Sequence, residues 1–102
     1  MKYGYIRGTT EDVIERQRKS IMQHGVDKIF VDKQIGARDQ LQLKEMMYEL
    51  QNGDIVVLES ISKLARSTMK LFKAIETFYK KDVTLISLNS GINTSSEIEK
   101  QV

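Results

Sequence analysis

The chain alternates short apolar runs with longer segments in which apolar residues recur every three or four positions. The apolar runs, which we expect to form strands, lie at 3–6, 28–31, 55–58 and 83–88. The periodic segments, which we expect to form helices, lie between them at 11–24, 39–51 and 67–81. This alternation predicts an α/β fold, a three-layer domain with a mostly parallel sheet of about four strands and flanking helices.

Capping residues and apolar stripes predict where the helices end and which sides face the core. Gly25 follows the first helix where a left-handed cap is typical, and Asp39 is a good N-cap for the second. Either Ser62 or Ser67 caps the third helix, and a capping pattern at 94–97 predicts that a further helix begins there. The expected inner positions are Val13, Ile14, Gln17, Ile21 and Met22, then Leu43, Met46, Met47 and Leu50, then Leu71, Phe72, Ile75, Phe78 and Tyr79.

Composition narrows the classes of chemistry. With 102 residues, of which 40% are hydrophobic, the chain fits one domain with one compact core. The absence of cysteine excludes disulfides and thiolate chemistry, and a single histidine leaves no metal-binding pattern, so we expect no metal. No glycine loop of a nucleotide-binding type is present, so we expect no nucleotide cofactor. Without a membrane-spanning stretch or a signal-peptide pattern, we expect a cytoplasmic protein that does not enter a membrane.

Cations cluster where two predicted strands end. Arg7 ends the first strand, and Lys63 and Arg66 follow the third, while Arg38 lies in the loop after the second. Ligands of open α/β sheets bind in the crevice outside the carboxyl ends of the strands, which would bring these cations together. Because the net charge is only +2, a nucleic-acid site requires such local focusing. Arg7 beside the hydroxyl of Thr9 therefore predicts a phosphate site.

Each candidate also has an ordinary structural interpretation. The cations are equally consistent with solvated loop residues, and Thr9 with an N-cap, since an acidic residue follows a threonine at the capping-box spacing. Gln17 is consistent with a plain helix residue, and Asp32 with a loop residue that satisfies backbone N–H groups. His24, at a helix end, receives no catalytic role.

Several segments match one family in order and spacing. They are Tyr5-Ile6-Arg7-Gly8-Thr9, Gln17, Phe30-Val31-Asp32-Lys33 followed by Gly36, the strand that starts at Gly53-Asp54, and Ile61-Ser62-Lys63-Leu64-Ala65-Arg66. Together they resemble the catalytic domain of serine recombinases, the resolvase/invertase family. The resemblance covers essentially the whole chain. It implies that residues 1–102 form a catalytic domain that ends at the start of a long dimerisation helix, from about residue 95, with no DNA-binding domain.

The resemblance also implies an activity. Members attack DNA with a side-chain hydroxyl, without a metal or other cofactor, form a covalent 5′-phosphoprotein, and exchange strands in a tetramer built from dimers. The partner would be double-stranded DNA. Carried over to this chain, the catalytic residues are Thr9, Arg7, Arg66 and Lys63. The supporting residues are Tyr5, Gln17, Asp32, Arg38, Gln40 and Ser62.

The departures from the family pattern lie at the site itself. Thr9 replaces the serine nucleophile, Gln40 stands where the family has an arginine, and Ser62-Lys63 stands where it has Asp-Arg. Two hypotheses follow. The chain is a site-specific recombinase with a threonine nucleophile, or it is a catalytically silent paralogue that serves assembly or regulation.

Overall fold

The strands form one sheet. In the computed structural model, residues 1–33, 40–65, 67–89 and 92–93 are described. The strand order is β2-β1-β3-β4-β5, in which the first four strands are parallel and β5 is antiparallel to β4. The bounds are β1 Lys2–Gly8, β2 Lys28–Lys33, β3 Ile55–Leu58, β4 Thr84–Ser87 and β5 Ile92–Asn93. The predicted mostly parallel sheet is confirmed, whereas β5 was missed because two residues carry no detectable periodicity.

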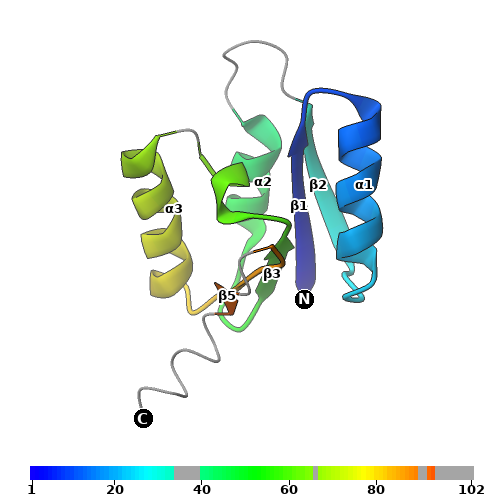
Figure 1. Ribbon diagram of the computed structural model, residues 1–102. Helices are drawn as coiled ribbons and strands as arrows, with labels where there is room; N and C mark the ends of the chain where they lie inside the picture. Colours follow the sequence, from blue (N-terminus) through cyan, green and yellow to red (C-terminus); the bar gives the residue numbers. More distant parts are fainter. Residues whose placement is uncertain (34–39, 66, 90–91, 94–102) are drawn as a thin grey trace.

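Helices cover both faces of the sheet, which confirms the predicted three layers. Helix α1 (Glu11–Met22) lies on one face, and α2 (Leu41–Glu49) and α3 (Thr68–Lys80) lie on the other (Figure 1). The core is divided in the same way. The α1 side buries Ile6 and Val57, and the opposite side buries Tyr5 and Leu58, as alternation along β1 and β3 requires.

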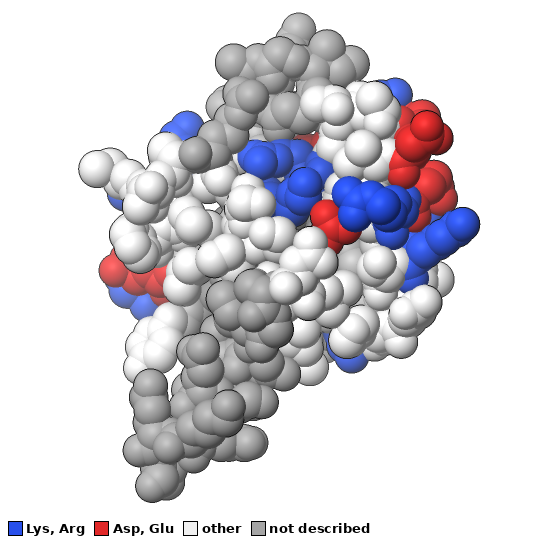
Figure 2. Space-filling model, viewed as in Figure 1, with Lys and Arg blue, Asp and Glu red and all other residues white. Residues whose placement is uncertain are grey.

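The region outside the carboxyl ends of β1 and β3, hereafter called the crevice, is the switch point of the sheet. These strands are neighbours, with Tyr5 opposite Leu58, but the chain leaves β1 toward α1 and leaves β3 toward the face that carries α3. Such a switch point is where open α/β sheets bind ligands. A short 3-10 helix, η1 (Ile61–Lys63), lies there directly after β3. Lysine and arginine side chains gather on this part of the surface (Figure 2).

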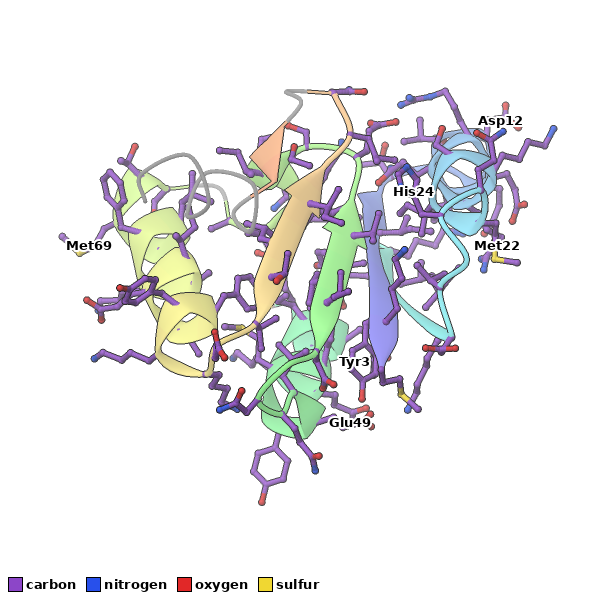
Figure 3. The ribbon with its side chains drawn as sticks, turned by 90° about the horizontal axis from the view of Figure 1, so that it is seen from below. Tyr3, Asp12, Met22, His24, Glu49 and Met69 are labelled. Carbon is purple, nitrogen blue, oxygen red and sulfur yellow. The ribbon has the colours of Figure 1, made fainter. Side chains whose placement is uncertain are left out.

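Helix α1 is capped by Thr10. Its Oγ1 accepts a hydrogen bond from the amide of Val13 at 3.4 Å. The helix ends two residues earlier than predicted, and Gly25 has the predicted left-handed conformation, with φ of 69°. Met22 is 55% exposed and points away from the sheet (Figure 3), so its assignment to the inner face was wrong. It follows the buried Ile21 by one residue, which rotates it about 100° around the helix.

Helix α2 is capped from outside its own sequence. Its N-cap residue, Gln40, makes no capping hydrogen bond with its side chain. Instead the carboxylate of Asp32 accepts hydrogen bonds from the amides of Gln42 and Leu43, at 2.9 and 3.0 Å. The predicted inner positions Leu43, Met46 and Leu50 are buried, and Met47 packs against them.

Asp32 was expected in a loop, but it belongs to β2, because pairing with Arg7 of β1 extends the strand to Lys33. Asp39, the expected cap of α2, lies outside the described residues, as do Gly36 and Arg38. The residues 94–97 expected to begin a helix also lie outside them.

Helix α3 presents a narrower inner face than predicted. Ser67, rather than Ser62, is its N-cap, and the Ser67 Oγ accepts from the amide of Lys70 at 3.2 Å. Phe72 and Tyr79 were expected to be buried but are 66% and 77% exposed. They lie on one flank of the stripe that does face the core, formed by Leu71, Ala74, Ile75 and Phe78. Among the described helices, none is long and apolar enough to cross a membrane.

Candidate active site

Arg7 joins the ends of β1 and β3. Its Nη2 donates a hydrogen bond to the carbonyl of Ser62 in η1, at 2.9 Å. Its Nη1 is buried and has no hydrogen-bond partner within the described part of the chain. A buried donor without an acceptor costs about 1–3 kcal/mol, and more when it is charged. Within the described part of the chain this donor therefore has no acceptor, which makes Arg7 a candidate ligand for an anion.

Thr9 and Thr10 form the whole connection between β1 and α1. Thr10 caps the helix, so the alternative interpretation of Thr9 as the cap does not hold. The Thr9 side chain is exposed and makes no hydrogen bond to any described residue. The connection is short because α1 packs closely on Gly8, where an added Cβ would lie 3.0 Å from the Val13 side chain. The Thr9 hydroxyl is thus held two residues from Arg7, and no contact with a described residue gives it a structural role.

The side chains of Tyr5, Asp32 and Gln40 form a hydrogen-bonded group that contacts η1. The Tyr5 hydroxyl donates to Asp32 Oδ2 at 2.7 Å and accepts from Gln40 Nε2 at 2.9 Å. Gln40 Nε2 also donates to the carbonyl of Lys63 at 3.0 Å. Burial raises the pKa of the Tyr5 phenol well above its usual value, and the adjacent Asp32 carboxylate acts in the same direction. Tyr5 is therefore a neutral donor and acceptor here, not an acid or base near neutral pH.

Gln17 supports the strand that carries Arg7. It is fully buried, and its Nε2 donates to the carbonyls of Arg7 at 2.8 Å and Val13 at 3.4 Å. Its Oε1 is buried without a partner among the described residues. Gln17 is thus more than a residue of the helix surface, because it fastens α1 to the end of β1.

The remaining predicted residues are Lys63 and Ser62, which lie in η1, and Arg66 and Arg38. Lys63 is half-buried in η1 and forms no ion pair with a described carboxylate. The Ser62 hydroxyl is exposed and lies 3.0 Å from the Ser60 hydroxyl, so its contribution to the crevice is the carbonyl that Arg7 binds. Arg66 and Arg38 lie outside the described residues. Among the described His, Asp and Glu residues, no group of three could hold a metal ion.

The family follows from comparison with known proteins. The family model described as "Resolvase, N terminal domain" matches residues 2–102. The chain belongs to the resolvase family.

Relatives agree with this family assignment. The Tn917 transposon resolvase of Enterococcus faecalis is 35% identical, over 96% of this chain and 54% of that protein. The serine recombinase gin of Escherichia phage Mu is 34% identical, over 94% of this chain and 51% of that protein. The chain therefore spans about half the length of these relatives.

Two solved structures share the fold. The N-terminal catalytic domain of TP901-1 integrase has a TM-score of 0.77 at 18% identity, covering 99% of this chain and 87% of that one. A resolvase family site-specific recombinase from Streptococcus pneumoniae has a TM-score of 0.76 at 19% identity, covering 98% and 87%.

One ion pair at the crevice of this resolvase-family chain was missed from the sequence. Glu59, the residue directly after β3, is only 6% exposed, and its carboxylate accepts from the guanidinium of Arg16 on α1. The pair ties α1 to the end of β3, across the sheet face that carries Val57. The available signal was an acidic residue placed directly after an apolar strand. Its partner, 43 positions earlier, could not be inferred from spacing.

Proposed function

We propose that this chain is the catalytic domain of a site-specific DNA recombinase that acts by transesterification. The observation that carries the proposal is Arg7, with one guanidinium nitrogen anchored on Ser62 and the other buried and unpaired among the described residues. The exposed hydroxyl of Thr9 lies two residues further on. A guanidinium held in a fixed direction beside an exposed hydroxyl suits attack on a phosphodiester.

The proposed step exchanges one phosphate ester for another. Thr9 Oγ1 forms a bond to phosphorus, the bond from phosphorus to the DNA 3′ oxygen breaks, and the phosphate stays on the DNA 5′ end as a phosphothreonine ester. The threonine hydroxyl loses a proton and the leaving 3′ oxygen gains one, so no net charge or oxidation change occurs. Because the ester is retained, the reverse attack by a 3′ hydroxyl can reseal the strand.

The cations stabilise charge on the phosphate. Arg7 Nη1 and the ammonium of Lys63 bind the non-bridging oxygens, on which negative charge increases in the transition state. Arg66 joins them in the proposal because of the sequence motif, and Arg38 because of its place in the loop after β2. Removal of one such donor from a preorganised site costs about a hundredfold in rate or more.

The proposed partner is double-stranded DNA. In the full-length protein we propose a homodimer that forms a tetramer with two DNA sites, as the family resemblance implies. The similarity to a transposon resolvase and to a serine recombinase supports the DNA-directed activity. The departures at Thr9, Gln40 and Ser62-Lys63 are then adaptations of a working site rather than its loss.

The test uses the two adjacent threonines as a matched pair. Residues 1–102 are joined to the dimerisation helix and DNA-binding domain of a characterised resolvase, and a nicked recombination site is assayed for a covalent protein–DNA adduct. Thr9→Ala should abolish the adduct and leave the thermal midpoint unchanged. Thr10→Ala should retain the adduct and lose about 1 kcal/mol of stability with the cap.

The outcomes separate the hypotheses. An adduct that persists in Thr9→Ala would show that another residue attacks. No adduct in the unsubstituted chimera, together with an adduct in Thr9→Ser, would support the silent paralogue, whose cations survive but whose nucleophile does not act.

A further inference from the structure

We infer that Gln40 is a positioning residue that holds η1, and through η1 the guanidinium of Arg7, in the arrangement that binds phosphate. The inference deepens the proposed function and rests on it, because it concerns the same crevice. The side-chain amide of Gln40 lies between two parts of the site that are far apart in sequence. Gln40 Nε2 lies 2.9 Å from the Tyr5 hydroxyl and 3.0 Å from the carbonyl of Lys63.

Two successive carbonyls of η1 are held by side chains. Arg7 Nη2 binds the Ser62 carbonyl, and Gln40 Nε2 binds the Lys63 carbonyl. A helix of only three residues leaves its last carbonyls without intrahelical partners. The position of η1 in the crevice therefore depends on these two donors, one from β1 and one from the start of α2.

Gln40 is itself firmly anchored. Its acceptor, the Tyr5 hydroxyl, is fixed by Asp32, and the same Asp32 carboxylate binds two amides at the N-terminus of α2. Tyr5 is 0% exposed and Asp32 is 9% exposed, so water does not readily replace these bonds. The result is a ring of hydrogen bonds that connects β1, β2, α2 and η1, and Gln40 closes it.

The ring explains how a neutral residue serves a phosphate site. Both N–H groups of the Gln40 amide are occupied inside the protein, so Gln40 does not contact the phosphate. Its effect reaches the anion through Arg7: the Ser62 carbonyl fixes Nη2, and the fork geometry of guanidinium then directs Nη1. If η1 moves, Nη1 loses its direction while the charge remains.

The experiment compares two glutamines of similar position on the 102-residue chain. Gln40→Met removes the donors and retains a similar volume. Gln42→Met is the control, because the Gln42 side chain makes no hydrogen bond to a described residue and its backbone amide is unchanged by the substitution. Inorganic phosphate is titrated while the guanidinium signals of Arg7 and the amide signal of Lys63 are followed by NMR, and thermal midpoints are measured separately.

In Gln40→Met we expect altered Arg7 guanidinium and Lys63 amide signals without phosphate. We also expect about five- to tenfold weaker phosphate binding, as for the loss of one neutral hydrogen bond. Gln42→Met should match the unsubstituted chain. Gln40→Arg retains N–H donors and should restore the Arg7 signals. Tyr5→Phe is a second test, needed if Gln40→Met does not fold. It removes the hydroxyl that accepts from Gln40 but keeps the aromatic side chain in the core, and it should change the Arg7 and Lys63 signals in the same way as Gln40→Met.

Unchanged Arg7 and Lys63 signals in both Gln40→Met and Tyr5→Phe would overturn the inference. A lower thermal midpoint with unchanged phosphate affinity would also overturn it, since Gln40 would then be only structural. Failure of the unsubstituted chain to bind phosphate would instead count against the proposed function, and the signals recorded without phosphate would still decide the role of Gln40.

Discussion

Arg7 Nη2 and the carbonyl of Ser62 lie 2.9 Å apart, which joins the end of β1 to the helix that follows β3. Fifty-five positions separate the two residues in the chain. Because one guanidinium nitrogen is occupied by this contact, the direction of the other is set by the protein before any ligand arrives. Preorganised donors of this kind contribute most to catalysis when charge develops next to them.

The first prediction concerns the fork of Arg7. Arg7→Lys keeps the charge, but an ammonium cannot bind the Ser62 carbonyl and a phosphate in the same fixed geometry. We expect single-turnover adduct formation to fall by roughly a hundredfold. Arg18→Lys, an exposed arginine on α1 paired with Glu15, is the control and should change little. A full rate in Arg7→Lys would show that charge alone suffices.

The second prediction concerns the methyl group of Thr9. A β-branched nucleophile has restricted rotation about χ1, and an off-rotamer side chain costs about 0.5–1.5 kcal/mol. Thr9→Ser should therefore raise the rate of adduct formation, by up to about tenfold. The measurement is the single-turnover rate on a nicked site. A slower Thr9→Ser variant would mean that the methyl group helps to hold the hydroxyl in line.

The third prediction concerns stability in alkali. Burial raises the pKa of Tyr5 above the ordinary value of 10.0, so the folded protein keeps this proton more tightly than the unfolded chain. The corresponding stability is fully present below that value and is lost as the pH rises above it. Urea unfolding near pH 9 and near pH 11 should show a smaller loss in Tyr5→Phe than in the unsubstituted protein. Tyr3, whose pKa burial also raises, should leave part of the loss in place. An equal loss in both proteins would show that Tyr5 does not contribute.

The fourth prediction concerns Arg16 and Glu59. Arg16→Met leaves the buried Glu59 carboxylate without its partner and should cost about 1–3 kcal/mol, less than for a fully buried pair because Arg16 is 59% exposed. The double variant with Glu59→Met should recover most of this loss. Urea unfolding of both single variants and the double variant gives the coupling energy. Arg18→Met, which breaks an exposed pair, should cost less than about 1 kcal/mol. Additive effects would show that the carboxylate is solvated despite its burial.

Much of the fold was predictable because its signals are local. The four long apolar runs became the four parallel strands, and the three periodic segments became α1, α2 and α3. Errors occurred where a residue's environment depends on a distant element. Met22 and Phe72 are apolar and lie next to helical stripes, but each follows an inward-facing residue by one position and is turned away from the sheet. Two-residue β5 exists only because β4 offers it an edge.

The sequence by itself determined the strand and helix pattern, the family motifs, and the presence of Arg7, Thr9 and Lys63 near the ends of neighbouring strands. Tertiary structure decided which groups are already occupied: Thr10 rather than Thr9 caps α1, Asp32 rather than a helix residue caps α2, and Gln40 bridges Tyr5 to η1. The physical reason is range. Periodicity acts over a few residues along the chain, whereas a hydrogen bond requires atoms within about 3 Å in space, and only the packed sheet brings residues 5, 32, 40 and 63 together.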